Sequence, residues 1–261
     1  MQPLHTWNPP SNLIGLFTDI DDTLTTDGAV APEVVAAIGQ LKARGLAVIP
    51  ITGRPVGWSV PFAQAWPVDA IVAENGAVAL RRRADGTLQK LHQQDAATRQ
   101  RNHAAMQRVL AAIEATVPGA RRAEDSAGRE CDIAVDHSEF VQLAQPQIDA
   151  CLRIMRDAGM NATVSSIHIN GWFGAHNKLQ GARWIVRELY GRELDAELDR
   201  WCYIGDSTND QLMFEAFANS FGVANIARFV PQLAHLPRYV TRHERGAGFI
   251  ELAERLCAAA A

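Results

Sequence analysis

The chain lacks long apolar runs, a targeting segment and any excess of positive charge. No apolar stretch of its 261 residues approaches the length of a membrane span, and residues 1–10 contain no basic segment followed by an apolar one. The net charge of −4 gives no support to a nucleic-acid or membrane-surface partner. With 48% hydrophobic residues available for a core, we expect a soluble, cytoplasmic globular protein.

Cysteine is also scarce, and its spacing excludes the usual cysteine-based sites. The four cysteines are Cys131, Cys151, Cys202 and Cys257, which lie far apart without metal-ligand spacing. Each has apolar neighbours, so we predict buried free thiols and not disulfides.

Lysine is rare among the basic residues. Only Lys42, Lys90 and Lys178 are lysines, out of 25 basic residues. A lysine in such an arginine-rich chain can mark a site where a compact ammonium fits and a planar guanidinium does not. We interpret Lys42 and Lys90 as surface residues, which leaves Lys178 as the candidate for such a site.

What the chain does have is a local concentration of acid. Asp19, Asp21 and Asp22 lie within four positions, directly after an apolar run typical of a buried strand. Carboxylates this close repel one another and resist desolvation, so they indicate a bound cation, a shared proton or chemistry. An acidic turn after a strand is the alternative from this segment alone.

The order of the predicted elements indicates an α/β fold. Apolar strands alternate with helices at both ends of the chain. The expected elements are strand 13–18, helix 32–44, strand 47–51, helix 58–66 and strand 70–73, and later helix 179–190, strand 201–204, helix 210–218 and strands 221–223 and 239–240. We therefore predict a doubly wound, Rossmann-like parallel sheet.

The middle of the chain has a different pattern. We predict a hairpin of strands 78–82 and 87–91, a long helix 96–116, a strand 131–135, a helix 139–158 and a strand 162–170. This grouping favours a separate α+β unit inserted into the first domain. The predicted domains are a core of residues 1–80 and 176–261 and a cap of residues 81–175.

Four polar clusters fall at the carboxyl ends of predicted core strands or at the return from the insert. They are Asp19 to Thr23, Thr52-Gly53-Arg54, Lys178, and the segment from Gly205 to Asp210. Ligands of open α/β sheets bind at this edge. One or two carboxylates, with water and a substrate phosphate, suit Mg²⁺, and a hydroxyl and a cation suit the oxygens of a transferring phosphoryl group. The combination therefore predicts phosphoryl transfer.

These clusters resemble, in order and spacing, the four motifs of the haloacid dehalogenase (HAD) superfamily of phosphatases. The resemblance implies that Asp19 is the nucleophile that forms an aspartyl-phosphate. It implies that Asp21 protonates the leaving alcohol and then activates water. Thr52 and Lys178 complete the implied catalytic set.

The resemblance also implies the binding residues. Those expected to bind substrate are Thr52, Gly53, Arg54, Lys178 and Asn209, with Ser207 in a supporting role. The implied Mg²⁺ ligands are Asp19, the main-chain carbonyl of Asp21, and Asp206, supported by Asp210.

The position of the insert narrows the resemblance. About thirty residues separate Asp22 from Thr52, whereas about a hundred separate Gly76 from His176. A cap between the second and third motifs is similar to that of the C2-capped HAD enzymes. The segments Glu74-Asn75-Gly76-Ala77 and Gly222-Val223-Ala224-Asn225 resemble the type IIB branch, which contains Cof-like, sucrose-phosphatase-like and mannosylglycerate-phosphatase-like sugar phosphatases, and phosphomannomutases. Two positions depart from the Cof-like pattern, because Asp22 replaces a usual Gly and Leu179 a frequent Gly.

A cap over the site is expected to exclude water and contact the leaving group. The candidate specificity residues are Arg129, Glu130, His168, Asn170 and Trp172, although ordinary surface roles remain an alternative for each.

The sequence thus predicts a Mg²⁺-dependent phosphatase of a small phosphorylated metabolite, with a sugar phosphate as the expected substrate. A sugar phosphomutase with the same motifs is the nearest alternative, and a non-catalytic sugar-phosphate sensor a more distant one. Neither the substrate nor the oligomeric state follows from the sequence.

Overall fold

The core of the protein is a six-stranded parallel sheet. The structure is a computed structural model, and it describes residues 1–258. The strands run in the order β1-β15-β14-β13-β2-β5, and every neighbouring pair is parallel. Their bounds are β1 Gln2–Pro3, β2 Gly15–Thr18, β5 Ala47–Pro50, β13 Trp201–Gly205, β14 Asn219–Gly222 and β15 Tyr239–Val240. The predicted doubly wound sheet is confirmed.

Helices cover both faces of this sheet, because successive residues of the central strands point to opposite sides. Leu16 of β2 packs in a cluster with residues of α1 (Pro32–Ala43), α2 (Val56–Ala65) and α7 (Arg245–Ala258). Its neighbour Phe17 packs with residues of α5 (Lys178–Tyr190) and α6 (Gln211–Ala216). The central strands β2, β5, β13 and β14 are fully buried between these layers. Because neighbouring strands are parallel, their carboxyl ends open at one edge.

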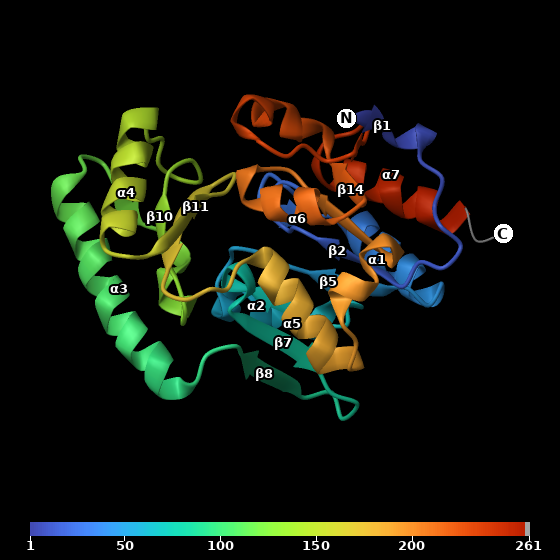
Figure 1. Cartoon of the computed structure of the whole chain (residues 1–261), viewed down its shortest axis with the longest axis horizontal. Helices are drawn as coiled ribbons and strands as arrows, with labels where there is room; N and C mark the ends of the chain where they lie inside the picture. The colour runs from blue at the N-terminus through green and yellow to red at the C-terminus, as the bar shows by residue number, and fades with distance from the viewer. Residues whose placement is uncertain (259–261) are drawn as a thin grey trace.

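A second, antiparallel sheet continues the core beyond β5. It consists of β6 (Ile71–Ala73), β7 (Val78–Arg82) and β8 (Leu88–His92), and a single parallel bridge joins Ile51 to Val72. Figure 1 shows β7 and β8 beside α5, away from the cap sheet. The hairpin was predicted to start the insert, but it pairs with β6 of the core. The domain limits at residues 81 and 175 stay a prediction.

The cap is an antiparallel sheet with two helices, beside the core (Figure 1). Its sheet has the order β11-β12-β10-β9. The elements are α3 Ala96–Thr116, β9 Arg121–Arg122, β10 Ile133–Asp136, α4 Gln145–Asp157, β11 Asn161–Val164 and β12 His168–Trp172. The predicted helix 96–116 is confirmed, and the carboxylate of Asp95 caps it by accepting the Thr98 N–H at 2.9 Å. The cap has its own apolar cluster around Met106, Cys151 and Met155.

Two predictions for the cap were wrong in detail. The predicted strand 162–170 is two antiparallel strands, because the chain turns at Ser165–Ile167, where the Ser165 hydroxyl accepts the His168 N–H at 3.0 Å. The predicted helix 139–158 begins only at Gln145. The preceding segment is a turn in which the Asp136 carboxylate accepts the N–H groups of Glu139 and Phe140.

The remaining short elements lie around the sheet edge. The hairpin β3 (Thr25–Thr26) and β4 (Ala29–Val30) follows the acidic cluster, and we name residues 25–30 the flap. Short 3-10 turns join other elements: η1 Leu4–Thr6, η2 Glu74–Gly76, η3 Glu124–Gly128, η4 Leu194–Ala196, η5 Leu198–Arg200, η6 Thr208–Asp210, η7 Ala224–Arg228 and η8 Val230–Gln232.

Helix α7 was not predicted from the sequence, although Phe249, Leu252 and Leu256 are apolar at helical spacing and buried. The alanine run 258–261, whose sequence predicts a frayed end, begins at the last residue of α7, and residues 259–261 lie outside the described part. The cysteines are free thiols as predicted, three of them buried and Cys257 partly exposed. Within residues 1–258, no helix is both long and apolar enough to cross a bilayer.

Candidate active site

The four sequence motifs meet at the carboxyl edge of the parallel sheet. Asp19 directly follows β2, and Asp206 directly follows the adjacent strand β13. Thr52 follows β5 on the other side of β2. Lys178 is the first residue of α5. The side chain of Asn177 caps the N-terminal end of this helix by accepting the Gln180 N–H at 2.9 Å. Each side chain is at least nine-tenths buried, so the protein interior fixes the cluster.

Asp19 lies against the ammonium of Lys178. Its Oδ1 is 2.8 Å from Lys178 Nζ. Burial raises the pKa of Asp19 to about 7, against the opposing effect of Lys178, while the nearby carboxylates of Asp210 and Asp21 raise it further. A second positive charge next to Asp19 would therefore favour its ionised form at neutral pH.

Lys178 also binds Asp210, which organises the loop after β13. Lys178 Nζ is 2.6 Å from Asp210 Oδ1, and Tyr203 Oη donates to the same oxygen. Asp210 Oδ2 accepts the main-chain N–H groups of Asp206 at 2.9 Å and Ser207 at 3.0 Å. Burial alone would lower the pKa of Lys178, but Asp19 and Asp210 outweigh it and raise the pKa. Both oxygens of Asp210 are thus already engaged.

Asp206 provides a carboxylate oxygen with no protein partner. The side chain is fully buried, and its Oδ1 accepts no hydrogen bond from any residue in the described part of the chain. Burial, followed by the charge of Asp19, raises its pKa well above the ordinary range. An isolated carboxylate oxygen in this position is costly unless a cation or a proton satisfies it.

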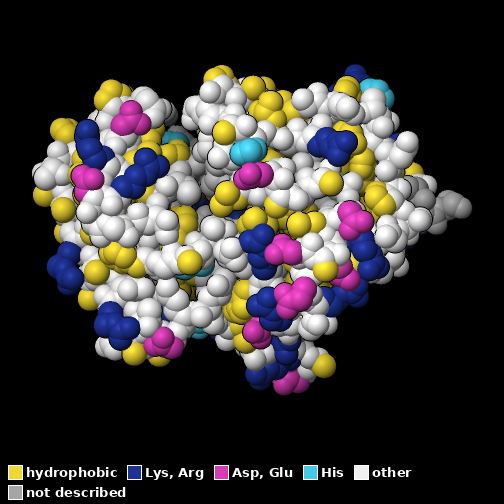
Figure 2. Space-filling view, in the orientation of Figure 1, with side chains coloured by type: hydrophobic (Ala, Val, Ile, Leu, Met, Phe, Trp, Pro, Cys, Tyr) yellow, Lys and Arg dark blue, Asp and Glu magenta, His cyan; other side chains and the backbone are white. Residues whose placement is uncertain are grey.

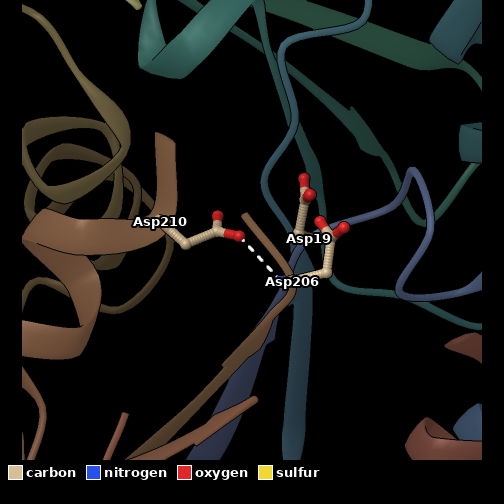
Figure 3. Close-up of side chains that lie close together, drawn as sticks. All are labelled: Asp19, Asp206 and Asp210. Atoms are coloured by element: carbon tan, nitrogen blue, oxygen red, sulfur yellow. Dashed lines mark hydrogen bonds between the residues drawn. The ribbon is translucent and has the colours of Figure 1, made fainter. Parts of the chain in front are cut away.

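The acidic residues fit a divalent cation. Ligand atoms of Asp19, Asp206 and Asp210 lie within 4.8 Å of one another. Figure 3 shows the carboxylates of Asp19 and Asp206 side by side, with Asp210 hydrogen-bonded to the main chain of Asp206. Because Asp210 is engaged, Asp19 and Asp206 are the available donors. Oxygen ligands from one or two carboxylates are the usual protein contribution to a Mg²⁺ site.

Asp21 faces a different partner. Its carboxylate pairs with the guanidinium of Arg54 at 2.9 Å. Burial raises the pKa of Asp21, and Arg54 opposes that rise. The two acids that the sequence assigns to separate roles therefore have separate partners, Lys178 for Asp19 and Arg54 for Asp21. Ligation of a metal by the Asp21 carbonyl stays a prediction.

The second motif connects the core to the cap. The Thr52 hydroxyl is buried next to the sheet and accepts the Arg54 N–H at 3.0 Å. The Arg54 guanidinium also binds two cap carboxylates, Glu139 at 2.7 Å and Asp125 at 3.3 Å. The sequence predicted that Arg54 binds substrate, whereas in this structure its guanidinium holds three protein carboxylates.

A cavity of about 400 Å³ adjoins Asp21. Its walls are formed by the loop that follows β2, the flap, two cap loops, and Arg228 and Arg245 of the core. The lining residues are Asp21, Asp22, Thr25, Asp27, Gly28, Arg54, Ser138, Glu139, Phe140, Ser166, Ile167, Arg228 and Arg245. The cavity is polar, and it lies where a group attached to a phosphate at Asp19 and protonated by Asp21 could extend.

The predicted cap specificity residues lie elsewhere. Arg129 is buried and donates to Gly53 O at 2.9 Å and to Asp132 at 2.8 Å. Glu130 pairs with Lys90 and His92.

His168, Asn170 and Trp172 lie on β12 and are also committed to the protein. His168 Nε2 is 2.8 Å from Glu139, and the Asn170 amide donates to Asp132 at 3.1 Å. Trp172 donates to His176 O at 2.8 Å. None of the five lines the cavity beside Asp21 within residues 1–258.

The structure adds residues that the sequence did not single out. Glu139, Arg228 and Arg245 line the cavity and carry charge. Arg228 and Arg245 are two of many arginines and have no local pattern that marks them. Glu139 lies in a predicted helix that proved to be a turn.

Comparison with known families finds one match by sequence. The haloacid dehalogenase-like hydrolase family matches residues 16–112, which include the first two motifs. Comparison with curated proteins finds no match.

Solved structures share the fold over nearly the whole chain. The Thermoplasma acidophilum protein 0175 is 18% identical, with a TM-score of 0.69 and coverage of 93% of this chain and 97% of that one. The sucrose-phosphatase of Synechocystis, solved with sucrose and phosphate, is 17% identical, with a TM-score of 0.66 and the same coverages. A trehalose-6-phosphate phosphatase related protein is 16% identical, with a TM-score of 0.61 and coverages of 93% and 96%.

The sequence match, the shared fold and the four motifs at one sheet edge agree with one another. Residues 16–112 therefore match the haloacid dehalogenase-like hydrolases in sequence, and the whole chain shares the fold of these solved structures, with its cap inserted between the second and third motifs.

Proposed function

We propose that the protein is a Mg²⁺-dependent phosphatase that hydrolyses a small phosphorylated metabolite, specifically a sugar phosphate. The observation that carries the proposal is that two neighbouring carboxylates, Asp19 and Asp21, have different partners and different surroundings. Asp19 lies against Lys178 at 2.8 Å and next to the unpartnered oxygen of Asp206. Asp21 lies on the cavity wall and has a raised pKa because of burial.

The chemistry follows from these positions. The ionised carboxylate of Asp19 attacks phosphorus, and the bond from phosphorus to the leaving oxygen breaks. Asp21 gives its proton to that oxygen, which leaves as an alcohol. Asp21 then takes a proton from the water that attacks the aspartyl-phosphate, and this step restores Asp19 and releases phosphate.

Positive charge is needed on both sides of the transferring group. Lys178 and the hydroxyl of Thr52 are the groups proposed to contact its oxygens. A bound Mg²⁺, held by Asp19 and Asp206, would neutralise charge on the phosphoryl oxygens. Asp210 would hold Lys178 and the loop of Asp206 in place through the contacts described above.

The cavity and the relatives support a sugar phosphate as the substrate class. The cavity of about 400 Å³ is lined mainly by polar and charged side chains, with Phe140 as an exposed aromatic group. Hydroxyl groups can exchange hydrogen bonds with such a lining. Two of the structurally similar proteins are described as a sucrose-phosphatase and a trehalose-6-phosphate phosphatase related protein.

A substrate screen with product analysis tests the proposal. The full-length protein is incubated with a panel of sugar and polyol phosphates, with Mg²⁺ or with EDTA. We expect free phosphate and the dephosphorylated alcohol with Mg²⁺ only. An isomerised sugar phosphate without free phosphate would instead indicate a phosphomutase, and tight binding of a sugar phosphate without turnover would indicate a sensor.

A further inference from the structure

Asp22 has no part in the proposed reaction, yet the fold holds it firmly. Its φ of 53° lies in the left-handed region, which few side chains adopt without support. Its N–H donates to the Thr25 hydroxyl at 2.8 Å, and its carbonyl accepts the Asn225 amide at 3.0 Å. Glycine adopts a positive φ more easily than aspartate does, so the presence of a carboxylate at this position indicates a specific function for it.

The side chain of Asp22 lies between two arginines. Its Oδ2 is 2.8 Å from Arg228, and its Oδ1 is 3.1 Å from Arg245. Arg228 ends the turn η7 after β14, and Arg245 begins α7. The Asp22 side chain is only 15% exposed, whereas those of Arg228 and Arg245 are 45% and 30% exposed. Two guanidiniums that converge on one carboxylate form a strong anion site.

This anion site is part of the substrate cavity. Asp22, Arg228 and Arg245 all line the same cavity as Asp21, the group proposed to protonate the leaving alcohol. Both arginines have one further acidic neighbour, since Arg245 is 2.7 Å from Asp27 and Arg228 is 3.4 Å from Asp206. A leaving group that carried its own carboxylate or phosphate would have to displace Asp22 or lie against its charge.

We infer that Asp22 is a specificity-determining residue whose carboxylate fills a two-arginine anion site on the cavity wall. This inference rests on the proposed phosphatase function and names its substrate class. The enzyme accepts phosphate esters with an uncharged, hydroxylated leaving group and rejects those with a second anionic group. Rejection comes from like-charge repulsion and from the loss of two ion pairs that Asp22 already makes.

Asp22→Gly tests the inference without straining the chain, because glycine accepts the positive φ. Asp27→Gly is the matched control. Asp27 also has a positive φ, of 51°, its side chain is 83% exposed, and its removal takes a carboxylate only from Arg245, which keeps its pair with Asp22. Neither residue belongs to the proposed catalytic set.

The substrates are two pairs that differ by one carboxylate. Glycerol 3-phosphate is compared with 3-phosphoglycerate, and glucitol 6-phosphate with 6-phosphogluconate. The wild type should prefer the uncharged member of each pair. In Asp22→Gly the ratio of kcat/KM for the charged over the uncharged member should rise about tenfold or more, the scale of a charge-assisted contact. Asp27→Gly should leave the ratio within about twofold.

A second substitution tests whether Arg245 contributes to the rise in the kcat/KM ratio. Arg245→Ala in the Asp22→Gly background should return the ratio toward that of the wild type. An unchanged ratio in Asp22→Gly, or an equal rise in Asp27→Gly, would overturn the inference.

A binding measurement separates this inference from the proposed function. Sulfate is titrated into each protein at constant ionic strength with chloride, and Tm is followed. Sulfate should raise the Tm of Asp22→Gly more than that of the wild type or Asp27→Gly, because only Asp22→Gly removes a carboxylate that both arginines share. Equal responses would refute the anion site even if turnover is normal. Absence of turnover in all three proteins would refute the phosphatase and with it the substrate preference, and the sulfate result would then decide only whether Asp22 fills a two-arginine anion site.

Discussion

At the scale of single residues, Lys178 links Asp19, the proposed nucleophile, to the loop that carries the proposed metal ligand Asp206. Lys178 is almost completely buried and holds both Asp19 and Asp210. Its rarity and its place after the insert were enough to single it out from the sequence. Arg228 and Arg245 could not be found in this way, because they meet Asp22 only after folding brings residues about two hundred positions apart together.

Removal of the Lys178 charge should destabilise the protein strongly. In Lys178→Met two buried carboxylates lose their partner, and we expect a loss of about 3–5 kcal/mol in the free energy of unfolding. Lys90→Met is the control, because its pair with Glu130 is exposed and should contribute less than about 1 kcal/mol. Urea unfolding of both variants in EDTA measures the difference. Similar losses would show that the buried pairs are not needed for stability.

At the scale of elements, cap loops are bound to the core next to Asp21, the proposed catalytic acid. The turn before α4 brings Glu139 to Arg54, and η2 of the core brings Glu74 to the start of β10. The hydrophobic pattern predicted most of the helices and strands that carry these loops. It could not predict the turn at residues 165–167 or the late start of α4, because side-chain hydrogen bonds from Ser165 and Asp136 decide them.

The ion pair of Glu139 should be lost in acid. Although burial opposes it, hydrogen bonds from His168 and Arg54 lower the pKa of Glu139 to about 2 from its ordinary value of 4.5. As the pH falls, Glu139 is protonated in the unfolded chain before it is protonated in the folded protein. The stabilisation by its ion pair is therefore complete above about pH 4.5 and falls as the pH drops toward 2.

Glu139→Gln isolates this contribution. Near pH 7 the variant should be less stable than the wild type by about 2 kcal/mol. This value is smaller than the full pKa shift of Glu139 would give, because solvent partly screens its carboxylate. Unfolding curves between pH 7 and pH 3.5 should show the gap closing below about pH 4.5. A gap that stays constant, or that widens in acid, would contradict the assigned ion pair.

Glu74 joins core and cap through main-chain groups. Its carboxylate accepts the N–H of Val56 at 3.0 Å from α2, and those of Glu130 and Cys131 from the cap. In Glu74→Ala these buried donors lose their acceptor, which should cost about 3 kcal/mol or more in unfolding free energy. Glu124→Ala, at an exposed position in η3, should change stability by less than about 0.5 kcal/mol. A small effect of Glu74→Ala would show that this contact is not needed.

At the scale of the whole molecule, a fixed reaction centre lies under a separate cap. Alternating strands and helices predicted the core, because a parallel sheet buried on both faces has a simple pattern. The pattern also located the insert, but not the cap residues that face the cavity. Those come from loops whose positions depend on contacts with Arg54 and with Thr208, which donates to Val164 O at 2.6 Å.

The charge distribution agrees with a small-molecule substrate. Figure 2 shows basic and acidic side chains intermixed over the face in view, and the net charge is −4. Neither feature favours a long polyanion. We therefore assign recognition to the cavity between the cap loops, the flap and the end of the core.

The most direct test of the central claim is phosphate release by Asp19→Asn, compared with the wild type, on the best substrate of the panel. Asp195→Asn, whose side chain is 59% exposed and pairs with Arg183, serves as the control for the same chemical change. The account predicts release by the wild type and Asp195→Asn that requires Mg²⁺, and a loss of at least about a thousandfold in Asp19→Asn, the scale of a missing nucleophile. Full activity of a folded Asp19→Asn protein would contradict it.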